Sequence, residues 1–153
     1  IGEWTVEGEA KMAPDQPAEK WKGTERVRAI GDLWIMAETQ VETSEGDMTT
    51  VVTLGFDPQK ERFVGTFIAS MMNYLWVYDG ALDADKRVLA LDNEGPSMIE
   101  EGKMAKYQDR IELVDGNHRI STAWVQGDDG QWHKIMEAHF HRKAHETKIE
   151  EAA

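Results

Sequence analysis

An alternation of apolar or small residues with polar residues, beginning at the third position, constrains the fold more than any other feature of this sequence. The apolar or small positions are Trp4, Val6, Gly8, Ala10 and Met12. The polar positions between them are Glu3, Thr5, Glu7, Glu9 and Lys11. Successive side chains of a β-strand point to opposite faces, so a period of two predicts a strand with one buried and one solvated face. No helical spacing reproduces this pattern.

The same rhythm continues along the chain and predicts about ten strands, many of them rich in β-branched and aromatic residues. After the run at 3–12, the others lie at about 20–30, 33–43, 48–57, 62–71, 74–82, 87–92, 103–114, 118–126 and 131–142. The connections carry turn residues such as Gly31-Asp32, Asp57-Pro58, Gly95-Pro96 and Asp115-Gly116-Asn117. Short connections favour antiparallel neighbours.

A single sheet of this size has two edges that must be protected, and closure into a barrel removes both. The pattern shows no convincing helix and no domain linker, and the chain of 153 residues is of single-domain length. We therefore predict an all-β fold, a single antiparallel up-and-down barrel of about ten strands. The barrel domain is expected at residues 1–143, followed by a polar C-terminal tail at 144–153.

Charge and composition narrow the possible partners. The 29 acidic and 17 basic residues give a formal net charge of -12, which repels phosphate backbones and anionic lipid, so neither nucleic acid nor a membrane is expected as a partner. The absence of cysteine removes disulfides, thiolate catalysis and Cys-based metal sites. A cytoplasmic location is expected, although the chain begins at Ile1, which leaves open the removal of a short export signal.

The first strand opens with Gly2-Glu3-Trp4, which resembles the G-x-W element at the start of lipocalin and fatty-acid-binding barrels of the calycin group. In lipocalins a basic residue at the end of the last strand lies over this tryptophan and closes the bottom of the barrel. Arg142 ends the last predicted strand. The resemblance therefore implies a lipocalin-like barrel in which Gly2, Trp4 and Arg142 are the closing residues.

A longer similarity covers much of the first half of the chain. Its segments are Gly23-Thr24-Glu25-Arg26-Val27-Arg28, Thr53-Leu54-Gly55-Phe56-Asp57-Pro58, Phe63-Val64-Gly65-Thr66, Ser70-Met71-Met72 and Leu75-Trp76-Val77-Tyr78. They resemble DUF1579, a bacterial domain family of unknown function. The resemblance implies a calycin-type barrel of bacterial origin, and it brings no activity, catalytic residue or cofactor with it.

Large, polarizable side chains are concentrated in the middle strands, where a barrel of eight or more strands can enclose a small ligand. Simple filling of the core is the other interpretation of such side chains. The leading hypothesis is a binding protein for a small apolar or amphipathic molecule, without a cofactor. The residues assigned to the ligand are Trp34, Met36, Met71, Trp76, Tyr107 and His139.

Histidines alternate on the last predicted strand, where His133, His139 and His141 share one parity. Two imidazoles at this spacing can face one metal ion, but no further ligand is marked by spacing, so no metal site is assigned and a solvated histidine row is favoured. One haem-binding branch of ten-stranded barrels uses a histidine on its closing strand. That resemblance makes His139 an alternative axial ligand, although the first strand departs from the branch.

No arrangement of residues indicates catalysis, and no catalytic residue is assigned. A G-x-S-x-G elbow and a Gly-rich phosphate loop are both missing from the sequence, and acidic pairs such as Asp128-Asp129 lie in polar turns. An enzyme is therefore the least supported class. A third hypothesis is a barrel filled with side chains that acts through a partner or oligomeric surface, and the oligomeric state is left open.

Overall fold

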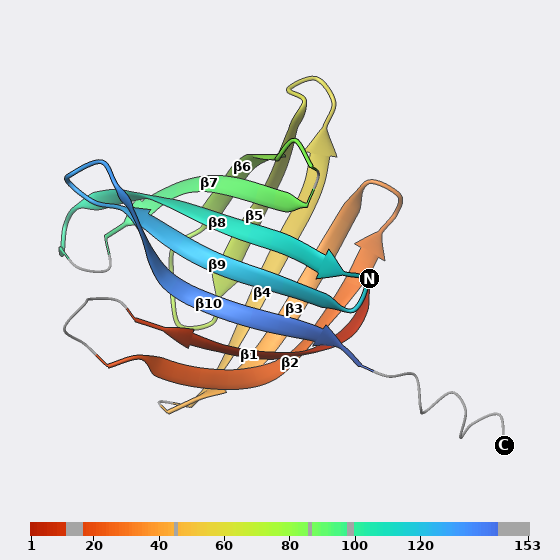
Figure 1. Ribbon diagram of the computed structural model, residues 1–153, viewed down its shortest axis with the longest axis horizontal. Helices are drawn as coiled ribbons and strands as arrows, with labels where there is room; N and C mark the ends of the chain where they lie inside the picture. Colours follow the sequence, from red (N-terminus) through yellow and green to blue (C-terminus); the bar gives the residue numbers. More distant parts are fainter. Residues whose placement is uncertain (12–16, 45, 86, 98–99, 144–153) are drawn as a thin grey trace, which may run out of the picture.

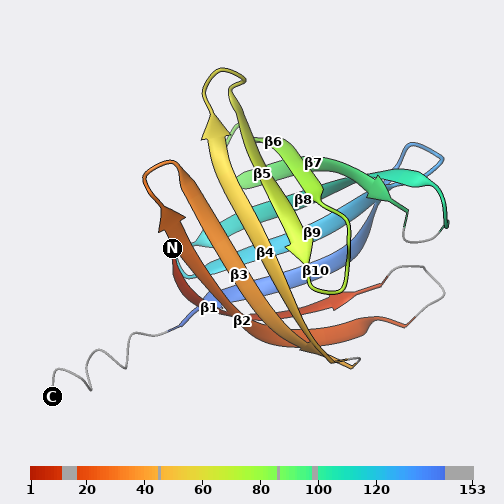
Figure 2. The same ribbon diagram turned by 180° about the vertical axis from the view of Figure 1, so that it is seen from behind.

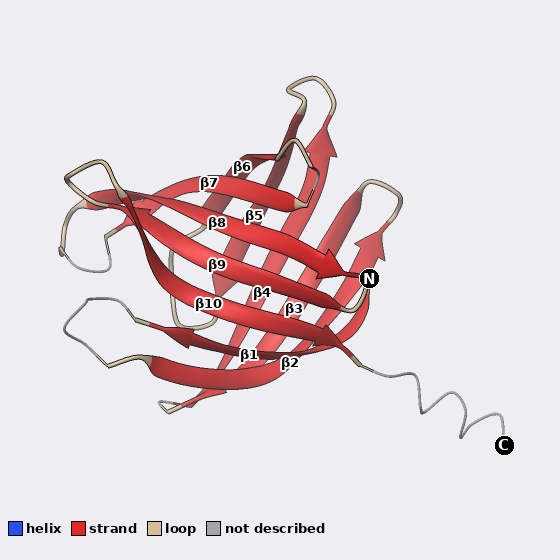
Figure 3. Cartoon of the chain, in the orientation of Figure 1, coloured by secondary structure: helices blue, strands red, loops and turns tan. Residues whose placement is uncertain are grey.

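The computed structural model describes residues 1–11, 17–44, 46–85, 87–97 and 100–143. All regular elements in these residues are β-strands, and they form one closed antiparallel barrel (Figures 1 and 3). Each strand pairs with its neighbours in sequence, and the first pairs with the last. The predicted all-β up-and-down barrel is therefore confirmed. No helix in the described residues is long and apolar enough to cross a membrane. The predicted tail at 144–153 lies outside the described residues.

Ten strands form the barrel, and the predicted runs match them to within two residues, except at the seventh. The strands are β1 (Gly2–Ala10), β2 (Glu19–Ile30), β3 (Trp34–Thr43), β4 (Gly46–Asp57), β5 (Arg62–Ala69), β6 (Trp76–Leu82), β7 (Val88–Pro96), β8 (Met104–Asp115), β9 (His118–Gln126) and β10 (Trp132–Arg142). Met12, predicted in the first strand, lies outside the described residues.

The strand β7 runs through the Gly95-Pro96 pair that the sequence predicted to be a turn. Gly95 lies against the ring of Trp76 from β6, and a Cβ atom at this position would overlap that ring. Glycine therefore serves here as a close-approach residue inside a strand rather than as a turn former. Pro96 is the last residue of the strand, a place where proline is tolerated.

The antiparallel order defines two ends of the barrel. At one end β1 begins and β10 finishes, and Trp4 lies opposite Arg142; we call this the Trp4 end. At the opposite end β6 begins, and we call this the Trp76 end. Residues 12–16 and 98–99 fall outside the described residues.

Most of the buried apolar side chains form two clusters on opposite walls of the barrel. The larger cluster, on β1, β2, β3 and β10, comprises Trp4, Val6, Val27, Ala37, Val41, Ala138 and Phe140. The smaller cluster, on β6 and β7, comprises Tyr78, Leu89 and Leu91. Val52 of β4 packs against both of them. The core is thus two packed walls with a shared contact rather than one central cluster.

Inward-facing glycines allow neighbouring strands to approach closely. A Cβ atom at Gly23 would overlap the carbonyl oxygen of Gln40 on β3, and one at Gly65 would overlap that of Thr53 on β4. Glycines inside strands often mark sharp bends at barrel corners. These two positions therefore contribute to the curvature that lets the sheet close.

Candidate functional site

Polar atoms are carried into the barrel interior by five side chains on three neighbouring strands. Trp76 and Tyr78 lie two residues apart on β6, Tyr107 and Asp109 lie two apart on β8, and Asn93 of β7 pairs with Tyr107. Residues two apart in a strand share a face, so each pair points the same way. We call these five residues the inner polar wall.

The aromatic part of the inner polar wall is built from edge-to-face contacts. The ring centroid of Trp76 lies 5.2 Å from that of Tyr107 and 4.9 Å from that of Tyr74. The Tyr107 hydroxyl donates a hydrogen bond of 2.9 Å to the Pro96 carbonyl oxygen. Trp76 is only 6% exposed, yet its indole Nε1 has no hydrogen-bond partner among the residues that the structure describes. An unsatisfied buried donor costs about 1–3 kcal/mol, so an acceptor beside this N–H would be stabilising.

The acidic part of the inner polar wall is a short hydrogen bond between Tyr78 and Asp109. The Tyr78 hydroxyl donates to Oδ2 of Asp109 at 2.5 Å. Burial raises the pKa of Asp109 to about 6, while hydrogen bonds from Tyr78 and Asn93 act in the opposite direction. Burial, with the charge of Asp109, also raises the pKa of Tyr78 well above its ordinary value. Tyr78 therefore stays a hydrogen-bond donor, and Asp109 changes charge near neutral pH.

At the Trp4 end, cationic groups stack on aromatic rings. The guanidinium carbon of Arg142 lies 4.4 Å from the ring centroid of Trp4. Its Nη1 donates to the carbonyl oxygen of Ile1 at 2.6 Å, and its Nε donates to that of Gly116 at 3.1 Å. Gly2 has a φ of 126°, and a Cβ atom there would contact Nη1 of Arg142. Arg142 therefore links the end of β10 to the start of β1.

A buried ion pair lies beside Trp4. Arg119 of β9 pairs with Glu25 of β2, and the other carboxylate oxygen of Glu25 accepts a hydrogen bond of 2.7 Å from Thr39. The guanidinium of Arg119 also lies 4.8 Å from the Trp4 ring centroid and 4.1 Å from that of Phe140. Burial and the charge of Arg142 lower the pKa of Arg119 to about 10. These charged side chains therefore lie together against Trp4.

The structure brings together two of the six residues that the sequence assigned to a ligand, Trp76 and Tyr107. On β3, Ile35 packs against the core and Ala37 is part of it, so Trp34 and Met36 point outward. Trp34 lies over Gly55 on the outer face of β4, and Met71 is exposed in the connection after β5. These three side chains do not line the interior.

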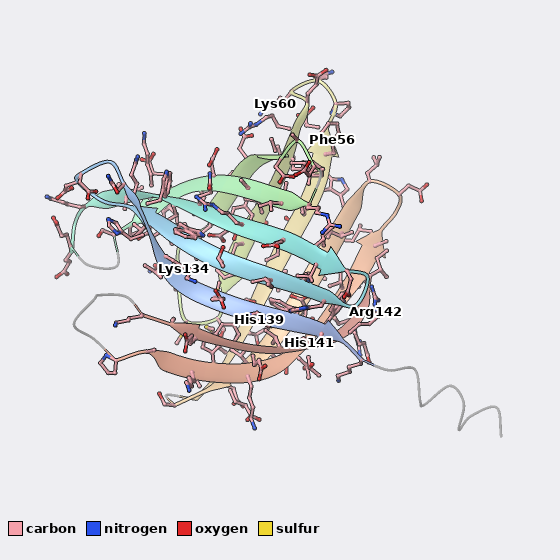
Figure 4. The ribbon with its side chains drawn as sticks, in the orientation of Figure 1. Phe56, Lys60, Lys134, His139, His141 and Arg142 are labelled. Carbon is pink, nitrogen blue, oxygen red and sulfur yellow. The ribbon has the colours of Figure 1, made fainter. Side chains whose placement is uncertain are left out.

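His139 also points outward, because Ala138 and Phe140 on either side of it belong to the core (Figure 4). Its Nδ1 lies 3.1 Å from Nε2 of His118, and its Nε2 lies 3.0 Å from a carboxylate oxygen of Glu137. A haem inside the barrel would be out of reach of this imidazole. Among the residues that the structure describes, no three His, Cys, Asp or Glu side chains are arranged to hold a metal ion.

The outward side of β10, β1 and β2 carries two open grooves of about 410 and about 550 Å³. Both are lined by Glu7, Lys22 and Glu42, and His141 and His139 each border one of them. The lining mixes both charges and is solvated. It therefore differs in character from the inner polar wall, which combines aromatic rings with a few polar atoms.

Sequence analysis missed three members of the inner polar wall as site residues, namely Tyr78, Asn93 and Asp109. The positions of Tyr78 and Asp109 carried a usable signal, because each lies two residues from an assigned residue, Trp76 or Tyr107, on the same strand. Asn93 had no such signal, since it fell beyond the predicted end of its strand at residue 92. Arg119 was missed because its partner, Glu25, lies far away in the sequence.

Similar solved structures and a matching family are known for this chain. The crystal structure of Rv2717c from M. tuberculosis is similar over 94% of this chain and 92% of that chain, with a TM-score of 0.60 and 13% identity. A redesigned β-barrel, mFAP1, bound to DFHBI, is similar over 92% of this chain and 93% of that chain, with a TM-score of 0.46 and 13% identity. The sequence matches no curated protein. Residues 1–142 match the model of a family described as a protein of unknown function, DUF1579. The chain therefore belongs to the DUF1579 family.

Proposed function

We propose that the barrel binds a small amphipathic molecule in its interior, with the polar group of that molecule against the inner polar wall. The observation that carries this proposal is the unpaired donor at Trp76 Nε1, on a side chain that is buried among aromatic rings. Buried polar groups of native proteins nearly always have a hydrogen-bond partner, so an unpaired buried donor indicates a partner outside the protein chain. A carbonyl or hydroxyl oxygen of a ligand would supply it.

The division of the core into two clusters supports the proposal that the interior has space for such a ligand. The two apolar clusters lie on opposite walls and share only the contact with Val52. On the inward face of β9, Ser121 and Ala123 have small side chains and are only partly buried. Eight strands enclose a space that side chains can just fill, and ten strands enclose more.

The charge of Asp109 narrows the ligand class. At pH 7.5 the carboxyl group is mostly ionised, because its pKa is about 6. An ionised carboxylate repels an anionic ligand and accepts a hydrogen bond from a neutral one. The proposed ligand is therefore an apolar body bearing a neutral group that both donates and accepts hydrogen bonds, such as an amide or an alcohol.

Displacement of an environment-sensitive apolar dye tests the proposal. At pH 7.5 a medium-chain amide should displace the dye at lower concentration than an alkyl sulfonate of equal length. Lowering the pH to 5 should narrow this difference, because Asp109 then becomes neutral. In Asp109→Asn the difference between the amide and the sulfonate should no longer depend on pH. The sulfonate stays anionic throughout, so Asp109 is the group whose charge changes.

The tryptophans provide matched reporters of where the molecule binds. Trp76→Phe should weaken binding and remove part of the change in intrinsic fluorescence, whereas Trp34→Phe, on the outer face, should leave binding unchanged. Equal effects of the two substitutions, or no saturable binding of any of these compounds, would contradict an interior site at the inner polar wall.

A further inference from the structure

Three histidines from two neighbouring strands meet on the outer face of the barrel, and we call them the outer histidine cluster. His118 of β9 lies directly opposite His141 of β10 in the ladder, and His139 lies two residues before His141. Arg119 and Phe140, which alternate with these histidines along the two strands, stack on each other inside the barrel, so the histidines point outward. Figure 4 shows His139 and His141 on this face.

The cluster belongs to the part of the wall where the barrel closes. The strands β9, β10 and β1 follow one another there, as both views show (Figures 1 and 2). Alternation along β10 related His139 to His141 in the sequence. Only the pairing of β9 with β10 adds His118, which lies on a different strand.

His118 and His139 each present one ring nitrogen to the other. Nε2 of His118 lies 3.1 Å from Nδ1 of His139. Imidazole nitrogens that bind zinc lie about 2.0–2.1 Å from the metal. A metal at those distances from both nitrogens would have an N–metal–N angle of roughly 100°, between the octahedral and the tetrahedral values. The separation therefore fits two ligands of one metal ion as well as it fits a hydrogen bond.

Glu137 determines which nitrogen of His139 is free to bind. A carboxylate oxygen of Glu137 lies 3.0 Å from Nε2 of His139, and the other carboxylate oxygen accepts a hydrogen bond of 2.8 Å from Lys134. Since an ionised carboxylate only accepts, Nε2 carries the proton and Nδ1 of the neutral ring presents its lone pair toward His118. Metal-binding histidines commonly donate their second N–H to a carboxylate in this way, which orients the ring.

His141 and Glu7 complete the surroundings of the pair. The rings of His141 and His118 stack with 4.4 Å between their centroids and 15° between their planes, which restricts rotation of His118. Glu7 of β1 lies opposite His139 in the ladder and borders the same groove as His139 and Glu137. These two carboxylates favour a cation at this place, and the net charge of -12 attracts cations to the molecule.

We propose that His118 and His139 bind one divalent transition-metal ion on the outer face of the barrel, independently of the interior. Neutral imidazole suits zinc, copper and nickel, whereas magnesium and calcium prefer oxygen ligands. Copper(II) has the highest affinity for nitrogen ligands in this series and is therefore the ion expected to bind most tightly. Two protein ligands leave the other coordination positions to water, so the bound ion stays accessible from solution.

Calorimetric titration of tag-free protein with Cu²⁺, Ni²⁺ and Zn²⁺ tests the site. One ion should bind per chain, Cu²⁺ most tightly, and Mg²⁺ should not bind. Glu137→Ala should weaken Cu²⁺ binding about 10–100-fold, the usual effect of losing an orienting partner, and His118→Ala and His139→Ala should each weaken it at least as much. His133→Ala is the matched control, because His133 is exposed on the same strand beside Asp129, and this variant should bind like wild type.

Electron paramagnetic resonance of the Cu²⁺ complex separates loss of the site from loss of the fold. Wild type and His133→Ala should show coupling of copper to two imidazole nitrogens. His118→Gln and His139→Gln should each lose this signal while circular dichroism shows an intact barrel. A wild-type protein that binds no Cu²⁺ at one ion per chain, or binding that survives unchanged in both His118→Ala and His139→Ala, would overturn the proposal. The contact between the two rings would then be a hydrogen bond alone.

Discussion

The ion pair between Glu25 and Arg119 is buried beside Trp4, and it connects β2 to β9 across the Trp4 end. Removing one member of a buried pair leaves an uncompensated charge, which costs about 3–5 kcal/mol. Glu25→Leu and Arg119→Met should each lower the free energy of unfolding in urea by this amount. The double variant should lose much less than the sum, because no buried charge remains. Additive losses would show that the two side chains do not depend on each other.

Asp109 makes stability depend on pH in a direction that can be worked out. Its pKa is raised from 3.8 to about 6, so the folded state binds more protons than the unfolded state between these values. Its contribution to stability is full below about pH 4 and falls by roughly 2–3 kcal/mol as the pH rises through 6. Urea unfolding of wild type minus that of Asp109→Asn should show this fall. A flat difference between pH 4 and 7 would contradict it.

Tyr78→Phe gives a second check on Asp109. The hydrogen bond from Tyr78 lowers the pKa of the Asp109 carboxyl, in opposition to burial. Removing the hydroxyl should therefore raise that pKa and extend the fall in stability to higher pH. An unchanged upper limit of the pH window would indicate that the Tyr78 hydrogen bond does not control Asp109.

The strands β4 and β5 pair closely at Gly65, where a Cβ atom would overlap the Thr53 carbonyl oxygen. Gly65→Ala should force the two strands apart and cost about 1–3 kcal/mol, the usual range for overpacking. Gly116→Ala is the matched control, because no atom of the described residues lies within 4 Å of a Cβ atom at that turn. Thermal unfolding followed by circular dichroism should separate the two variants. Equal melting temperatures would mean that the approach at Gly65 is not tight.

The whole barrel offers a test of whether its interior is open or filled. Ser121 of β9 faces inward and is partly buried, whereas Ala138 of β10 is 1% exposed in the packed wall. Ser121→Leu should be nearly neutral in urea unfolding and should reduce dye binding, because the added side chain occupies free space. Ala138→Leu should cost about 1–3 kcal/mol through overpacking. If both variants lose equal stability, the interior is filled, and the barrel acts through its surface.

Sequence analysis assigned two of the five members of the inner polar wall, Trp76 and Tyr107. Trp76 points inward in the structure, although the run Leu75-Trp76-Val77-Tyr78 is apolar on both faces and Leu75 and Val77 are exposed. Both faces of β3 carry apolar side chains, Trp34 and Met36 on one and Ile35 and Ala37 on the other. Choosing the wrong face as the inward one moves every side chain of the strand to the other side. Only the packing of the neighbouring strands determines which face of β3 points inward.

The sequence by itself determined the ten strands, their antiparallel order and the inward position of Trp4, because alternation and short connections are local properties. Only the tertiary structure decided which residues meet across the barrel. It placed His139 outside, and it joined Glu25 to Arg119 and Tyr78 to Asp109. A charged residue that faces inward breaks the apolar pattern, and its partner lies on a distant strand. Such pairs exist only once the sheet has curved and closed.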